Sequence, residues 1–144
     1  MLVEAVLAKK NHLIWTISPD ISVYKALEMM EEKNIGALPV MQDDKLTGMF
    51  SERDYARKII LKGKSSKDTL VKDAMSTSVY CIDKKKTLDE CMAVMTLKRV
   101  RHLPVMENEK MIGLISIGDV VKNIINEQEH VIENLYQYIR GVYY

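Results

Sequence analysis

The sequence has few of the features that mark secreted, membrane-spanning or nucleic-acid-binding proteins. Two cysteines in 144 residues are too few for a disulfide framework. No apolar run approaches the length of a membrane span, and Glu4 interrupts the short apolar start, which argues against a signal peptide. With 21 basic and 20 acidic residues, the formal charge of +1 provides no general attraction for nucleic acid or an anionic membrane. We therefore expect a cytoplasmic protein without nucleic-acid or membrane partners.

Motifs of catalytic and metal-binding sites are also missing. The Gly-Lys-Ser run at residues 63–65 resembles the end of a P-loop, but the first glycine of that motif would fall on Lys58. A nucleophile elbow around Ser116 would need glycine at Leu114. The three histidines are scattered, so they suggest neither a metal site nor an acid-base pair. The sequence therefore predicts a protein that is not an enzyme and has no metal or catalytic cofactor.

The chain contains an internal duplication. Residues 17–60 align without a gap with residues 82–125, and a Leu-Pro-Val-Met block occurs in both segments. This agreement exceeds what shared composition supplies, so we interpret it as a true repeat. Residues 3–7 also resemble residues 71–75, although at a different offset.

Each copy has the pattern of a β-α-β-β-α unit. The elements expected in the first copy are a strand at 12–17, a helix at 22–33, strands at 37–41 and 45–50, and a final helix. The second copy repeats them, with strands at 103–106 and 110–115. Ser22 and Thr87 are the expected helix N-caps. Because two short helices cannot cover such a small sheet, we expect an α/β fold of the α+β type, in which the two sheets pack together about an approximate twofold axis and share a core.

The end of the chain departs from the repeat. Residues 119–140 contain no proline or glycine, and apolar residues recur at near-helical spacing, which predicts one long amphipathic helix. Its apolar stripe would either close over the chain's own core or form a contact between two copies of the chain, and we favour a homodimer. The expected boundaries are 1–62 for the first repeat, 63–69 for a polar linker, 70–126 for the second repeat and 127–144 for a C-terminal helical extension.

A short motif follows the last strand of each copy. It consists of glycine, two apolar residues, serine, two further residues and aspartate, with Ser51 and Asp54 in the first copy and Ser116 and Asp119 in the second. An ionised aspartate accepts two hydrogen bonds side by side, which suits the adjacent hydroxyls of a ribose. A serine followed three residues later by an acid is also the start of a capped helix. The repetition of the motif beside a seam favours a ligand site, and the capping role stays open.

These features together resemble a tandem pair of CBS domains, also called a Bateman module, of the kind found in small stand-alone bacterial proteins. The resemblance rests on the two motifs, the two Leu-Pro-Val strands and the two-copy layout, and it covers residues 3–126 approximately. It implies a regulatory module that binds an adenosine nucleotide (AMP, ADP, ATP or NAD(H)) in clefts between the repeats and signals to an unknown regulated protein. A structural or oligomerisation module without a ligand is the alternative.

The resemblance also implies how residues combine into two clefts. In the family, the serine and aspartate hold ribose, and the residues before the proline of the partner copy contact base or phosphate. Asp54 would therefore share a cleft with Arg101 and His102. Asp119 would face the pre-proline residues 36–37 of the first copy.

Further ligand contacts follow from the same resemblance. Arg53 would be a second phosphate partner, whereas Gly118 at the equivalent position cannot play that part. Solvated surface charge is the default for a lone arginine, so a phosphate role for Arg53 or Arg101 competes with that interpretation. The complete set of implied ligand-binding residues is Thr16, Ile17, Gly36, Ala37, Leu38, Pro39, Ser51, Arg53, Asp54, Val79, Ile82, Arg101, His102, Leu103, Pro104, Ser116 and Asp119.

Overall fold

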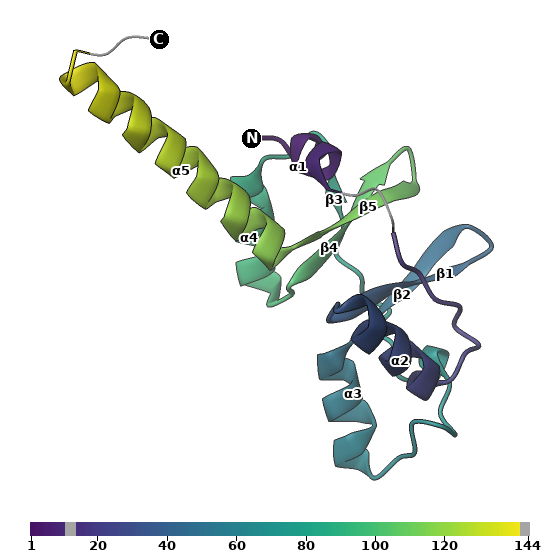
Figure 1. Cartoon of the computed structure of the whole chain (residues 1–144). Helices are drawn as coiled ribbons and strands as arrows, with labels where there is room; N and C mark the ends of the chain where they lie inside the picture. Colours follow the sequence, from purple (N-terminus) through teal and green to yellow (C-terminus); the bar gives the residue numbers. More distant parts are fainter. Residues whose placement is uncertain (11–13, 142–144) are drawn as a thin grey trace.

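Two small sheets, one in each copy, organise the chain in the computed structural model, which describes residues 1–10 and 14–141 (Figure 1). The first sheet consists of β1 (Ala37–Gln42) and β2 (Lys45–Ser51), and the second of β3 (Ile82–Asp83), β4 (His102–Glu107) and β5 (Lys110–Ser116). The helices are α1 (Val3–Lys9), α2 (Val23–Lys33), α3 (Glu52–Lys58), α4 (Leu88–Lys98) and α5 (Ile117–Ile139), with short 3₁₀ helices η1 (Ile60–Lys62) and η2 (Val71–Asp73). The mixed α+β fold expected from the sequence is confirmed.

The two hairpins show that the duplication extends to backbone detail. Val40 pairs with Gly48 in the first hairpin and Val105 with Gly113 in the second, and in each the register shifts at the following residue. Both turns have two residues at positive φ, between 49° and 66°. Such turns match the right-handed twist of the strands that they join. The two copies therefore present the ends of their last strands in the same way.

The first strand of the first copy is shorter than predicted. The sequence predicts a strand at 12–17, but residues 14–16 have no regular structure and Ile17 alone forms a bridge, to Val40 of β1. Ile17 is buried, whereas residues 14–16 are exposed or half-buried, so Ile17 is the one residue among the described residues 14–17 that belongs to the core. His12 lies outside the described residues.

Each copy builds a hydrophobic core that includes the lead segment of the other copy. Helix α1, at the start of the first copy, places Val3 and Val6 in the core of the second copy. The segment containing η2, at the start of the second copy, places Val71 and Ala74 in the core of the first. The single shared core expected from the sequence is therefore wrong. Each small sheet needs extra apolar cover, and the exchanged lead segments supply it. The repeat boundaries themselves stay a prediction.

Helix α5 begins inside the fold and ends outside it. The helix is continuous from its cap at Ser116, and Figure 1 shows its second half extending away from the rest of the chain. Val120 and Asn123 near its start are buried. The apolar residues of the second half are exposed: Val131, Ile132, Leu135, Tyr138 and Ile139. This half of the helix therefore does not close over the chain's own core. Among the described helices, neither α5 nor any other is long and apolar enough to cross a membrane.

Candidate functional site

A cleft of about 700 Å³ opens at the seam between the two copies. Its first-copy wall comes from the start of β1, the end of β2 and α3, and its second-copy wall from the segment before β3 and the connection from α4 to β4. The lining residues are Gly36, Ala37, Met49, Ser51, Glu52, Arg53, Asp54, Arg57, Lys58, Ser76, Ser78, Val79, Tyr80, Lys98, Arg99, Val100, Arg101 and His102. A volume of this size is typical of sites for small molecules.

The residues implied by the family resemblance divide between this cleft and its surroundings. Those that line the cleft are Gly36, Ala37, Ser51, Arg53, Asp54, Val79, Arg101 and His102. The structure thus brings Asp54, Arg101 and His102 together, and it adds Gly36 and Ala37, which the resemblance placed opposite Asp119. The implied residues that are buried in the protein are Ile17, Leu38, Pro39, Ile82, Leu103 and Pro104, and Thr16 is exposed. Ser116 and Asp119 lie at the start of α5.

The serine and aspartate of each motif form a helix cap. The Ser51 hydroxyl accepts a hydrogen bond from Asp54 N at 3.2 Å, and Asp54 Oδ2 accepts one from Ser51 N at 2.9 Å. Ser116 and Asp119 make the same contacts at 3.1 and 2.8 Å. These are capping boxes, so the structural role weighed from the sequence is present in both copies. In each copy the cap uses Oδ2 of the carboxylate, which leaves Oδ1 available for other donors.

Asp54 lies at the floor of the cleft and is held firmly there. Its side chain and backbone together are only 7% exposed. Oδ1 accepts a hydrogen bond from the Ser76 hydroxyl at 2.8 Å and lies 3.3 Å from Lys58 Nζ. Ser76 is itself fixed by two backbone hydrogen bonds to Met49 of β2, at 2.8 and 2.9 Å. The carboxylate is therefore oriented before any ligand arrives, which lowers the entropic cost of binding.

Basic side chains from both copies line the cleft of Asp54. They are Arg53, Arg57 and Lys58 from α3, and Lys98, Arg99 and Arg101 from the end of α4 and the residues before β4. These six basic groups face two carboxylates in the lining, in a chain whose net charge is only +1. A concave surface lined by one sign of charge concentrates ligands of the opposite sign. The cleft is therefore suited to an anion.

His102 adds a titratable group to the second-copy wall. Burial lowers its pKa below 6.5, the nearby Asp119 carboxylate opposes this effect, and the Lys10 and Arg101 cations lower the pKa further. The imidazole is therefore neutral at pH 7. A phosphate bound beside it would favour the protonated form.

Several cleft residues were missed by the sequence analysis. Ser76 and Tyr80 come from the irregular segment before β3, and the Lys98 ammonium lies 5.2 Å from the centre of the Tyr80 ring. Arg99 ends α4 in the left-handed conformation, with φ 55°, where glycine or asparagine is more usual. The only available signal was the run of basic residues at the end of the expected helix. Ser76 and Tyr80 gave none.

The second motif has a different neighbour. Lys10, directly after α1, donates hydrogen bonds to Asp119 Oδ2 at 2.6 Å and to the Leu114 carbonyl at 3.0 Å. Burial by itself would raise the pKa of Asp119, but the hydrogen bonds from Lys10 and Ser116 lower it below its ordinary value. Asp119 is therefore paired with a cation of its own chain.

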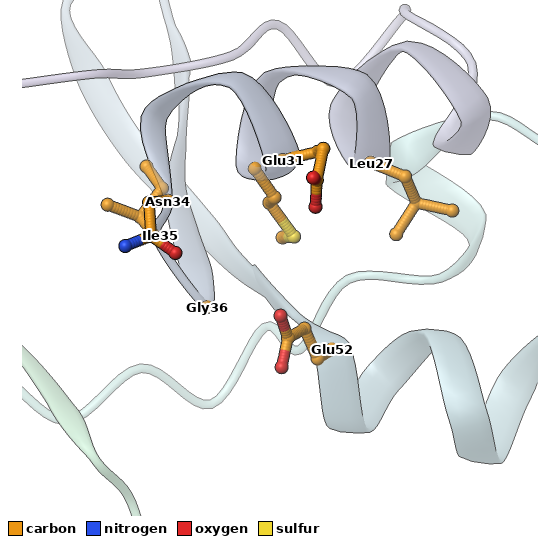
Figure 2. A pocket seen from close by; sticks show the side chains of 7 residues that line it. Leu27, Glu31, Asn34, Ile35, Gly36 and Glu52 are labelled. Carbon is orange, nitrogen blue, oxygen red and sulfur yellow. The ribbon is translucent and has the colours of Figure 1, made fainter.

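Another cavity, of about 440 Å³, adjoins the cleft and shares Gly36 and Glu52 with it. Figure 2 shows Glu31 from α2 and Glu52 from the start of α3 directed toward this space, with Leu27 beside them. Its lining has two carboxylates and no basic side chain. It is therefore unsuited to a phosphate, and the cleft of Asp54 is the stronger candidate for an anionic ligand.

Comparison with known sequences identifies the repeat. The family model for the CBS domain matches at residues 8–61 and again at 71–126. The mitochondrial CBS domain-containing protein CBSX3 of Arabidopsis thaliana is 38% identical over 135 residues, which is 90% of this chain and 65% of that protein. The CBS domain-containing protein YhcV of Bacillus subtilis is 27% identical over 113 residues, or 78% of this chain and 80% of that protein. The chain thus spans less than two thirds of the Arabidopsis relative's length.

Solved structures give the same result. A protein with CBS domains from Burkholderia ambifaria superposes with a TM-score of 0.86 at 45% identity, covering 89% of this chain and 96% of that chain. The CBS-domain containing protein ATU1752 from Agrobacterium tumefaciens superposes with a TM-score of 0.81 at 36% identity, covering 85% and 98%. Sequence, fold and the repeated motif agree. This chain belongs to the CBS-domain family and carries the domain twice.

Proposed function

We propose that this chain is a regulatory module that binds a phosphate-bearing adenosine nucleotide in the cleft of Asp54. The observation that carries the proposal is the pairing of one buried, oriented carboxylate from the first copy with basic side chains from both copies. The carboxylate suits the adjacent hydroxyls of ribose, and arginine suits phosphate oxygens. A ligand that contacts both copies stabilises the relative arrangement of the copies in which its contacts are best. The change in this arrangement is the signal to a regulated protein.

A structural neighbour supports adenosine as the common part of the ligand. The CBS domain pair of protein MJ0100, with a TM-score of 0.75 at 19% identity, was solved with 5′-methylthioadenosine and S-adenosyl-L-methionine. Neither compound carries a phosphate. The six basic side chains here favour nucleotides that do, and ADP, ATP or NAD(H), each with more than one phosphate, over AMP.

The proposal assigns the chain no catalytic activity of its own. Inosine-5′-monophosphate dehydrogenase of Methanocaldococcus jannaschii, 35% identical over 109 residues, matches this chain over only 21% of its length. Such a partial match is consistent with a regulatory module that exists both alone and attached to an enzyme. A cytoplasmic location remains our expectation from the sequence.

A homodimer is the second part of the proposal. The exposed apolar residues in the second half of α5 form a continuous stripe, and contact with a second copy would remove it from water. An oligomerisation module with an empty cleft is the competing function, because the capping boxes give both motif aspartates a role without a ligand.

Isothermal titration calorimetry with AMP, ADP, ATP, NAD and S-adenosylmethionine separates the two functions. We expect saturable binding of the phosphate-bearing compounds. Arg101→Ala removes an exposed side chain of the cleft and should weaken ATP binding about tenfold or more, since one charge-assisted hydrogen bond is lost. Lys25→Ala removes an exposed lysine of α2 outside the cleft and serves as the control. Absence of binding for all five compounds would favour the oligomerisation module.

A further inference from the structure

The aspartates of the two motifs have different hydrogen-bond donors around them. In the first copy, Ser76 donates twice, from its amide to the Met49 carbonyl at 2.8 Å and from its hydroxyl to Asp54 Oδ1 at 2.8 Å. In the second copy, the Nζ of one lysine donates to the Leu114 carbonyl, the equivalent of Met49 O, at 3.0 Å. The same Nζ donates at 2.6 Å to Asp119 Oδ2, the oxygen that also accepts the cap hydrogen bond.

That lysine, Lys10, lies at the second-copy counterpart of the open cleft. Its ammonium bridges the end of β5 and the start of α5, the two segments whose first-copy equivalents line the open cleft. The contact is partly shielded, with the Lys10 side chain 37% and the Asp119 side chain 22% exposed. Asp54 also has a lysine beside it, but Lys58 Nζ lies 3.3 Å from Asp54 Oδ1 and donates its hydrogen bond to the Met75 carbonyl, whereas Lys10 Nζ donates directly to Asp119 at 2.6 Å.

The second motif also offers less to a phosphate. Gly118 stands where Arg53 stands in the first copy, so α5 provides no guanidinium at this position. A nucleotide would have to break the pair of Lys10 and Asp119 and would lack the guanidinium that Arg53 provides in the first copy.

We propose that Lys10 takes the place of a ligand at the second motif and excludes nucleotide from it. Each chain therefore binds one nucleotide, at Asp54, although it carries two motifs. This inference rests on the proposed function, because it concerns which of the two motifs the nucleotide occupies.

Titration of ATP into the whole protein tests the inference through the number of sites. We expect one ATP per chain for the natural sequence and a second for Lys10→Ala. Lys10→Ser should also gain the second site, since it leaves a short hydroxyl like that of Ser76, and it provides a second variant if the first does not fold. Lys9→Ala removes the exposed neighbouring lysine and should keep one site. Adding Asp119→Ala to Lys10→Ala should abolish the second site.

The outcomes for Lys10 and for the proposed function are separate. If the natural protein already binds two ATP per chain, or if neither Lys10 variant gains a site, the inference about Lys10 is overturned while nucleotide binding stands. If a variant loses a site that the natural protein has, Lys10 is a ligand contact and the inference is again overturned. If the natural protein binds no ATP but Lys10→Ala binds one, Lys10 acts as inferred and the cleft of Asp54 is the wrong site. Binding by no form overturns both.

Discussion

Replacing Asp54 with alanine should destabilise the ligand-free protein more than replacing Asp119 does. Both residues complete a capping box, so a purely capping role would give equal losses. Their surroundings differ, however. Asp54 also accepts a hydrogen bond from Ser76 and pairs with Lys58, whereas Asp119 pairs with the half-exposed Lys10.

The expected losses follow from these contacts. Asp54→Ala removes a buried charged acceptor and leaves the Ser51 amide and the Ser76 hydroxyl without it, for which we expect a loss of about 3 kcal/mol. Asp119→Ala removes a cap and a partly exposed ion pair, for which we expect about 1 to 2 kcal/mol. For a chain of this length, the Asp54 loss corresponds to a decrease in Tm of about 6 to 12 °C.

Urea unfolding followed by circular dichroism measures both free energies of unfolding. Equal slopes for the natural protein and the two variants would show that the variants unfold in the same way. Equal losses, or a larger loss for Asp119→Ala, would refute the claim that Asp54 is anchored more strongly than Asp119. In the presence of ATP the gap should widen, because only Asp54 would then also lose ligand stabilisation.

Three further predictions concern pH, packing and assembly. Burial holds the pKa of His102 below 6.5, so the stability that depends on the neutral imidazole is fully present above pH 6.5 and is lost as the pH falls below that value. The urea midpoint should therefore decline between pH 7.5 and 5, and His102→Gln should flatten this decline. An unchanged decline in the variant would contradict the assignment to His102. A Cβ at Gly48 would lie 2.9 Å from the Ser76 backbone oxygen, whereas at Gly113 the three nearest atoms belong to one α1 side chain. Gly48→Ala should therefore lower the free energy of unfolding in urea by about 1 to 3 kcal/mol, and Gly113→Ala should lower it less. A larger loss for Gly113→Ala would contradict the rigid packing of the segment containing η2 against β2. Leu135→Glu in the exposed stripe should convert a dimer into a monomer in light scattering after gel filtration, and a natural protein that is already monomeric would contradict the proposed homodimer.

The elements that the sequence predicted well are those defined by local contacts. Helix caps at Ser22 and Thr87 depend on residues three positions away, and the structure shows both. The hairpins depend on alternating apolar residues and a two-residue turn, so their positions agree to within a residue. Within the predicted strand at 12–17, the described residues 14–17 form a single bridge, because Ile17 is the one residue among them that is buried in the core.

The parts that could not be predicted depend on distant contacts. Val3 and Val71 begin similar segments, and nothing in their order along the chain reveals that each packs into the other copy. Lys10 lies 109 residues before the aspartate that it pairs with, so no spacing rule could connect them. The alignment of the two motifs predicted their similarity. It could not reveal that a lysine from the lead segment makes their surroundings different.

A crystal structure of the protein with ATP tests the central claim most directly. We predict density for one nucleotide per chain in the cleft between the copies, with ribose hydroxyls on the Asp54 carboxylate and phosphates beside Arg53 and Arg101. The Lys10 to Asp119 contact should remain intact. An empty cleft at saturating ATP, or a nucleotide whose ribose lies on Asp119, would contradict the account.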